Sequence, residues 1–433
     1  MGEFMIKLEE DKLNRKDLLD NIFSIFSTFG NQDGQGLTML INGKYGTGKS
    51  TLLNFIKEKN LSEDNKFNIV SYDAWECNYF ENPIIPLMYS LSKLENNAKK
   101  VKDAAKNVVK AIPISFFRTL ANITKIDISA IADKESDEFS DFDKYKNAID
   151  SYKEVLKGYC KDKKTIFLVD ELDRCLPEYQ IKVLESIYHV LNIPNLIVVI
   201  AIDKDQLDAS IKSKFGIHTD TYGYLSKFIQ YELDLPKGNT YEYIQSLMTF
   251  HVEDSSYVKS IMANLFESIN LPIRDCQIIV QKLNLICKEV KDGWGHTTPY
   301  YYYYPTSVLF LLLLKHTNQK VYKKYFNNTI EMSYDKTKIA LKNTTFYKFL
   351  NDIENSDFKQ LFDYLLKDGF GQAVALQLIN LFDDIALINE QELATYLNRT
   401  VEDVVQLTRK SRFGSWYYPG NRNSLIKTVD IIL

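Results

Sequence analysis

A glycine-rich turn between an apolar strand and a helix constrains this chain more than any other stretch. Residues 37–42 are predicted to form a short buried strand, and residues 50–57 a helix with one apolar face. The segment that joins them, residues 43–51, fits the pattern G-x-x-x-x-G-K-[ST] at every fixed position. Strand, loop and helix in this order predict a cradle for phosphate groups at the helix N-terminus.

The residue types in this loop indicate how it would bind a triphosphate. Glycines let successive backbone N–H groups point inward at an anion. We expect the Lys49 ammonium to reach the β- and γ-phosphates, and the Ser50 hydroxyl to be a ligand of Mg²⁺, which prefers oxygen. The residues expected to bind the nucleotide are Gly43, Lys44, Tyr45, Gly46, Thr47, Gly48, Lys49, Ser50 and Thr51.

A second motif places two acids at the end of the apolar strand 165–169. In an open parallel sheet, ligands lie at the carboxyl ends of the strands. Asp170 is therefore expected to hold Mg²⁺, directly or through water, and Glu171 to polarise a water for attack on the γ-phosphate. The alternative is a strand that ends in solvated acids. Asp203, after the apolar strand 195–202, either senses the γ-phosphate or caps the next helix.

The length of 433 residues requires more than one hydrophobic core. The predicted fold class is α/β, a three-layer P-loop NTPase core with a mainly parallel sheet, followed by an all-α lid and a C-terminal helical domain. Residues 1–9 form an N-terminal segment that includes a cloning scar, and residues 10–236 form the core. The core carries a Lys-rich helical insertion at about 95–145. The helical lid covers 237–330, and the helical partner-binding domain covers 331–433.

Composition excludes several classes of protein. The five cysteines are scattered without C-x-x-C spacing, which argues against a disulfide framework or a zinc site and favours a reducing, cytoplasmic environment. The longest apolar run, residues 308–314, is far shorter than the ~20 residues of a transmembrane helix. The net charge of -4 gives no global reason to expect nucleic-acid binding.

Three segments leave alternatives open. The basic amphipathic part of the insertion, residues 95–120, either contacts an anionic membrane surface or a partner, or is a solvated helix face packed on the sheet. The tyrosine run 300–304 either stacks on bases or fills a core or interface. Residues 390–396 and 401–410 have the outline of a helix-turn-helix, which is also a common hairpin in helical domains.

These motifs together resemble the KAP family of P-loop NTPases. The resemblance covers roughly residues 10 to 290. Many family members carry membrane-spanning helices between the two nucleotide motifs, whereas this chain has the Lys-rich stretch there. The stretches that carry the resemblance are Gly43 to Ser50, Asp73-Ala74-Trp75, Asp170-Glu171-Leu172-Asp173-Arg174-Cys175 with Pro177, Tyr224 to Pro236, and Leu271-Pro272-Ile273-Arg274.

The resemblance implies roles for two arginines. Arg174 is expected to act as an arginine finger or as a bridge to a neighbouring subunit. The alternative is an ion pair of Arg174 with Asp173 or Glu178. Arg274 is expected to contact the γ-phosphate as a sensor and close the lid, and the alternative is a surface arginine.

The function expected from these features is that of a Mg²⁺-dependent, ATP-hydrolysing switch that is slow without its partner. It would couple nucleotide state to homo-oligomer assembly or to a protein partner through the helical C-terminal region. A phage-exclusion protein in the family makes antiviral defence an implication of the resemblance. ATP is favoured over GTP because residues 202–205 lack an Asn-Lys-x-Asp block. Alternatives are a DNA-associated motor or loader that uses the C-terminal hairpin, and an ATP-gated scaffold with negligible hydrolysis.

Overall fold

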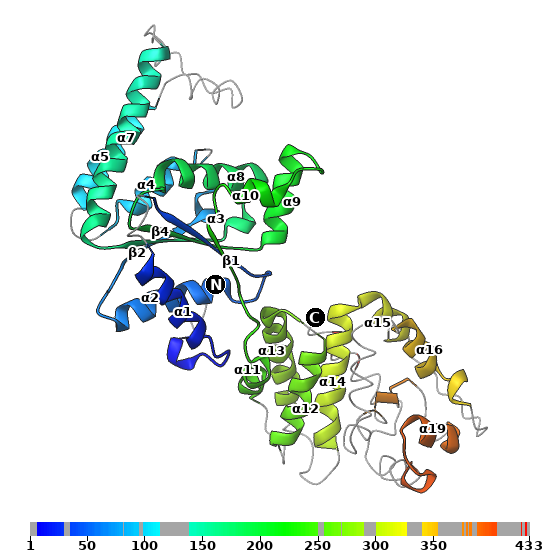
Figure 1. Cartoon of the computed structure of the whole chain (residues 1–433). Helices are drawn as coiled ribbons and strands as arrows, with labels where there is room; N and C mark the ends of the chain where they lie inside the picture. The colour runs from blue at the N-terminus through cyan, green and yellow to red at the C-terminus, as the bar shows by residue number, and fades with distance from the viewer. Residues whose placement is uncertain are drawn as a thin grey trace. The chain divides into compact units, whose positions relative to one another are not determined.

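The computed structural model forms two compact units, Met1–Gly238 and Asn239–Leu433, each of which we describe by itself (Figure 1). The boundary expected near residue 330 stays a prediction. The structure describes residues 7–29, 35–80, 82–94, 98–112, 138–249, 255–269, 271–289, 300–326, 340–353, 375, 378–379, 381–382, 388–404, 426 and 429–430.

A sheet of five parallel strands forms the centre of the first unit, in the order β2-β3-β4-β1-β5. The predicted parallel α/β core is thereby confirmed. Strands β1, β3 and β4 are buried along nearly their whole length, as expected where helices cover both faces. The strands are β1 (Leu37–Asn42), β2 (Asn68–Asp73), β3 (Thr165–Asp170), β4 (Leu196–Ile202) and β5 (Tyr231–Asp234).

Strand order decides where the two sequence motifs meet. The phosphate loop follows β1 and the acids follow β3, and β4 lies between these strands. Neighbouring strands lie about 4.8 Å apart, so the two strand ends are separated by roughly 10 Å. That distance leaves room for phosphate groups and a metal ion between the loop and the acids.

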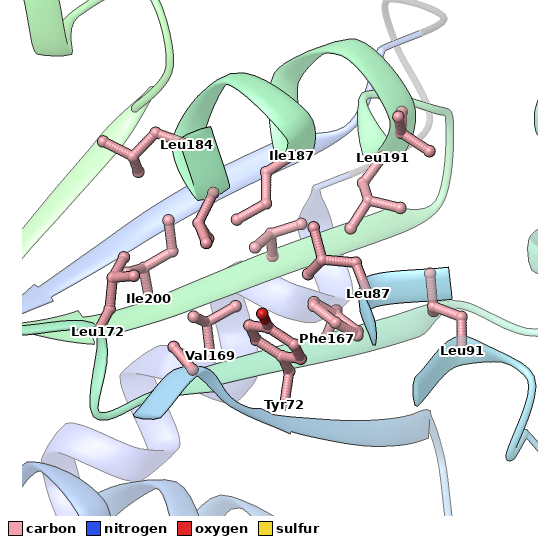
Figure 2. Close-up of a cluster of buried hydrophobic side chains, with 14 of the residues drawn as sticks. Tyr72, Leu87, Leu91, Phe167, Val169, Leu172, Leu184, Ile187, Leu191 and Ile200 are labelled. Carbon is pink, nitrogen blue, oxygen red and sulfur yellow. The ribbon is translucent and has the colours of Figure 1, made fainter. Parts of the chain in front are cut away.

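Helices cover the two faces of the sheet as separate layers (Figure 1). One face packs against α1 (Lys16–Thr28) and α2 (Lys49–Ser62). The other packs against α4, α8 and the helices that follow β4. Figure 2 shows this second layer, where Leu184, Ile187 and Leu191 lie over Phe167 and Ile200. Burying side chains of this size contributes about 1.5–3 kcal/mol each. The helices of this layer are α3 (Ala74–Cys77), α4 (Ile84–Leu91), α8 (Pro177–Ser186), α9 (Lys204–Phe215) and α10 (Thr221–Leu225).

Two helices of this layer have irregular C-terminal ends. Helix α8 is α-helical to Ser186, and residues 187–191 continue it with π-helical turns. The sequence of residues 224–230 predicts a helix throughout, and this prediction is wrong beyond Leu225, where α10 ends. Gln230 is needed at the sheet instead, because its side chain accepts a hydrogen bond from the Thr38 N–H at 2.7 Å and its own N–H donates to the Thr38 carbonyl at 3.0 Å.

The described part of the Lys-rich insertion contains two helices that lie side by side, α5 (Ala98–Ala111) and α7 (Glu138–Asp162), the second of which runs on beyond the insertion (Figure 1). The apolar side chains of α5, Val101, Ala105 and Val108, are buried in the core of the unit. The apolar face of this helix is therefore taken up within the chain. The side chains that α5 exposes include Lys99, Lys100, Lys102, Lys106 and Lys110.

Helices make up the second unit as the structure describes it. The apolar run 308–314 is buried throughout within α14, so it forms the centre of this unit. The structure describes no helix that is long and apolar enough to cross a membrane. The tyrosine run 300–304 is the first part of α14, and residues 405–410 of the predicted hairpin lie outside the described residues. The helices are α11 (Thr240–Leu247), α12 (Ser255–Ser268), α13 (Ile273–Glu289), α14 (Tyr300–Thr317), α15 (Gln319–Phe326), α16 (Thr345–Asp352) and α19 (Glu390–Tyr396).

The connection between α2 and β2 gives a test of this fold. The buried Asn60 side chain accepts from the Phe67 N–H at 2.9 Å and donates to the Phe67 carbonyl at 3.0 Å. Asn60→Ala leaves both backbone groups without these partners, so we expect the free energy of unfolding to fall by about 1–3 kcal/mol in urea titrations. The control Asn54→Ala removes a half-buried amide on the same helix and should cost less than about 0.5 kcal/mol. Equal losses in the two variants would contradict this account.

Candidate functional site

The phosphate loop is built by glycine conformation at the start of α2. Gly46 and Gly48 have φ angles of 79° and 87°, a region that residues with a side chain rarely adopt. The Leu52 N–H donates to the Gly48 carbonyl at 3.0 Å and closes the first turn of the helix. The earlier N–H groups of α2 thus remain available to an anion. Gly43 and Lys49 are buried, Gly46, Thr47, Gly48, Ser50 and Thr51 are half-buried, and Lys44 and Tyr45 are exposed.

The ammonium group of Lys49 lies inside the loop. It donates to the carbonyl of Gly43 at 2.8 Å and, more weakly, to that of Lys44 at 3.4 Å. It also pairs with the Asp173 carboxylate at 3.0 Å, and both side chains are only 9% exposed. The loop backbone thus supplies two of the acceptors of the Lys49 ammonium, and the segment after β3 supplies the third.

Ser50 and Asp170, the two predicted Mg²⁺ ligands, are brought together. Burial raises the pKa of Asp170 above its ordinary value, and the nearby Ser50 hydroxyl and a hydrogen bond from the Glu171 N–H at 2.9 Å oppose that shift. The described residues contain no group of three or more His, Cys, Asp or Glu side chains that could hold a metal ion. The pair of hard oxygen donors fits Mg²⁺, which is bound through few side chains together with water and substrate phosphates.

Glu171 occupies a strained position beside these ligands. Its φ of 57° lies in the left-handed region, which is uncommon for a residue other than glycine. Burial and the nearby Asp170 raise the pKa of Glu171 to about 7, and the charge of Arg174 opposes this rise. A carboxylate with a raised pKa beside a metal ligand has the chemistry of a general base.

Arg174 contacts residues of its own phosphate site. Its guanidinium forms an ion pair with Glu171 and lies over the Tyr45 ring, 5.7 Å from the ring centroid. Neither of the ion pairs considered from the sequence is the one observed, because Glu178 pairs with Lys214 at 2.6 Å and Asp173 with Lys49. Arg174 therefore connects the loop after β1 to the acid after β3.

Asp203 caps the helix that follows β4, which is one of its two expected roles. Its side chain accepts from the Asp205 N–H at 3.1 Å at the start of α9. Its own N–H donates to the Asp173 carboxylate at 3.2 Å. The neighbouring Lys204 side chain pairs with Glu232 at 2.7 Å.

Sequence reasoning missed two residues of the site, Asp173 and Arg15. Asp173 was weighed only as a partner of Arg174, and its contact with Lys49 depends on the sheet order. Arg15 precedes α1 and is 2% exposed. It donates to the carbonyl of Thr47 at 2.7 Å and to that of Gly48 at 3.3 Å. No sequence pattern identifies Arg15 as a site residue. The one local signal is Asp11, which accepts a hydrogen bond from the Arg15 N–H at 2.8 Å and so fixes the turn before α1.

Three other residues in the stretches singled out from the sequence are described within their own units. Arg274 is exposed at the start of α13 in the second unit, and its role as a sensor stays a prediction. Trp75 is 51% exposed in the short helix α3, so it is not a core residue. Cys175 is buried.

Comparison with known proteins identifies one family. A family model described as the KAP family P-loop domain matches residues 19–290. No curated protein sequence matches the chain.

Several solved structures align with the chain at low similarity. The ORC2 protein of Aeropyrum pernix, in ADPNP-ADP complexes, is 10% identical with a TM-score of 0.38 over 95% of this chain and 97% of that one. Drosophila ORC bound to DNA is 12% identical with a TM-score of 0.35 over 96% and 79%. The Aeropyrum pernix ORC1 protein in complex with DNA is 11% identical with a TM-score of 0.31 over 79% and 83%. Similarity at this level supports no conclusion about activity or partners.

The contact of Arg15 with the loop carbonyls gives a test of the site. Arg15→Ala removes two charged hydrogen bonds that hold the back of the loop, so we expect triphosphate affinity to fall about tenfold or more in calorimetric titrations. Lys16→Ala removes an exposed positive charge next to Arg15 and should leave the affinity unchanged. Equal effects of the two substitutions would show that the net charge of the protein, and not the contact of Arg15 with the loop, sets the triphosphate affinity.

Proposed function

This chain belongs to the KAP family of P-loop NTPases, and we propose that it is a Mg²⁺-dependent ATPase that works as a molecular switch. The observation that carries the proposal is the convergence of Lys49, the Ser50–Asp170 pair and Glu171 at one edge of the sheet. These groups supply the charge clamp, the metal ligands and the base that phosphoryl transfer to water requires.

Each residue of the site has one task in this proposal. The loop N–H groups and Lys49 bind the phosphates and neutralise charge that develops on them. Ser50 and Asp170 would hold Mg²⁺, which would supply positive charge to stabilise the phosphates during transfer. Glu171 accepts a proton from the attacking water. ATP is preferred to GTP, because Asp203 and Lys204 are engaged by α9 and Glu232 rather than presented as a guanine-binding block.

The connection to the second unit supports the switch role. The Leu235 N–H, directly after β5, donates to the Asn42 carbonyl at 2.7 Å, immediately before the phosphate loop. A side chain at Gly238, the last residue of the first unit, would collide with Leu13, whose carbonyl lies 2.5 Å from the Cβ position. The last residues of the first unit, which lead into the second unit, therefore contact parts of the chain that touch the phosphate loop. Arg274 is proposed to sense the γ-phosphate from that unit.

The output of the switch is proposed to be assembly of copies of this chain or binding of a protein partner through the helical C-terminal region. Turnover by the isolated chain is proposed to be slow, because a missing arginine finger lowers phosphoryl transfer by about 10³–10⁵. A role in antiviral defence rests on the family resemblance alone.

Two substitutions separate binding from chemistry. We expect Lys49→Ala to abolish both ATP binding and phosphate release, because it removes the cation at the β- and γ-phosphates. Glu171→Gln should keep ATP binding and lose turnover by about 10² or more, because a general base contributes about 10²–10⁴. Binding is measured by calorimetry and turnover by phosphate release, with Glu178→Gln as the control for charge removal. Unchanged turnover in Lys49→Ala would refute the ATPase assignment.

The Glu171→Gln variant also tests the switch. Loaded with ATP, it should change the mass of the particle in solution or retain a protein partner, and the ADP-loaded form should do neither. If the mass is identical and no partner is retained with either nucleotide, the switch role is wrong and only the ATPase activity remains proposed.

Arg174 gives a separate test. We propose that its ion pair with Glu171 restrains the base in the free chain, and that it acts as a finger only after this pair breaks. Arg174→Ala should then raise partner-free phosphate release a few fold, because Glu171 is released. A fall in partner-free release by orders of magnitude would show instead that Arg174 already acts as a finger in the isolated chain.

A further inference from the structure

We propose that Asp173 is the internal counter-anion of Lys49, and that a nucleoside triphosphate must displace it in order to bind. This inference rests on the proposed function and adds a residue that sets the affinity of the same site. Asp173 would thereby discriminate between ligands by the number of their phosphates.

The contacts of Lys49 leave no donor position unused. An ammonium group has three protons. The acceptors around this one are the carbonyls of Gly43 and Lys44, at 2.8 and 3.4 Å, and the Asp173 carboxylate at 3.0 Å. A phosphate oxygen that binds Lys49 must therefore replace one of these acceptors.

Asp173 is the acceptor that a triphosphate replaces. The two carbonyls belong to the loop backbone that also forms the phosphate cradle, so they stay in place when the cradle is filled. The carboxylate is an anion on a short 3-10 turn, residues 172–174, and it would face the negative charge of the γ-phosphate at close range. Like charges in a site that water barely reaches repel strongly, which favours departure of the carboxylate.

Displacement of Asp173 would also change the contacts at the start of α9. The oxygen of Asp173 that contacts Lys49 also accepts the Asp203 N–H at 3.2 Å, and Asp203 caps α9. The carboxylate thus joins the phosphate loop, the turn after β3 and the first residue of the loop after β4. A ligand that takes Lys49 from Asp173 alters the contacts of all three segments together.

Removal of the charge without loss of the hydrogen-bond acceptor tests the proposal. Asp173→Asn keeps an oxygen that can accept from Lys49 and from the Asp203 N–H. We expect a non-hydrolysable ATP analogue with Mg²⁺ to bind at least about tenfold more tightly to this variant, because one like charge a few ångströms from the phosphates is removed. ADP, which lacks the γ-phosphate, should gain less. The matched control is Glu178→Gln, which removes the same charge from an exposed acid paired with Lys214.

The ratio of the two affinities is the decisive measurement, because a merely structural residue would change ATP-analogue and ADP binding equally. Wild-type protein that binds the analogue, with an Asp173→Asn variant that binds it no more tightly, would overturn this inference and leave the ATPase assignment intact. If the wild-type protein binds no ATP, both this inference and the ATPase assignment are wrong.

A second measurement needs no nucleotide. Lys49→Ala leaves Asp173 buried without its counter-ion and should lower the melting temperature by about 5 °C or more. The double variant Lys49→Ala/Asp173→Asn should recover most of that loss, because no buried charge remains. Additive losses in the double variant would show that the two side chains do not depend on each other, and would overturn the pairing on which the inference rests.

Discussion

The burial of one positive charge, that of Lys49, organises the phosphate site. A cation with so little exposure persists only where fixed acceptors compensate for the water it has lost. The loop supplies two carbonyls and the segment after β3 supplies the Asp173 carboxylate. Arg15 in turn holds two other carbonyls of the loop from behind. Charged groups therefore hold the loop backbone on two sides, Lys49 on one and Arg15 on the other. The ion pair of Lys49 with Asp173 also fixes the position of the loop relative to the acids after β3.

The parallel sheet makes this arrangement possible because it places all strand ends at one edge. Asn42, the last residue of β1, shows how tightly that edge is joined. Its side-chain oxygen accepts from the Lys204 N–H at 3.0 Å, and its amide donates to Asp234 at 2.7 Å. One amide thus connects the ends of β1, β4 and β5. The connection to the second unit begins directly after β5, so it belongs to the same hydrogen-bonded edge. A ligand held by the phosphate loop therefore contacts an edge that includes this connection.

The sequence predicted the parts of this framework that depend on local patterns. Strands 37–42 and 165–170 appear where apolar residues bounded by polar ones indicated them, because a strand buried on both faces needs such a run. The failure at residues 226–230 has a physical cause, since Gln230 bonds to the edge of β1 and local helical periodicity carries no information about that contact. The P-loop and the acids after β3 were likewise found as motifs, whereas their ion pairs were not.

The pairing of charges across the site could not be read from spacing. Asp173 and Arg174 are adjacent in the chain, yet the first bonds to Lys49 and the second to Glu171, because successive residues of the short turn point in different directions. Each acid in the segment after β3 therefore has a different partner: Ser50 for Asp170, Arg174 for Glu171 and Lys49 for Asp173. The charges of Asp73 and Asp173 act on both Asp170 and Glu171 at this edge. Burial first, and then the charges of neighbouring acids, raise the pKa values of Asp170 and Glu171, which makes the edge receptive to added positive charge. A divalent cation bound with phosphate is the ligand that satisfies the acids and the loop at the same time.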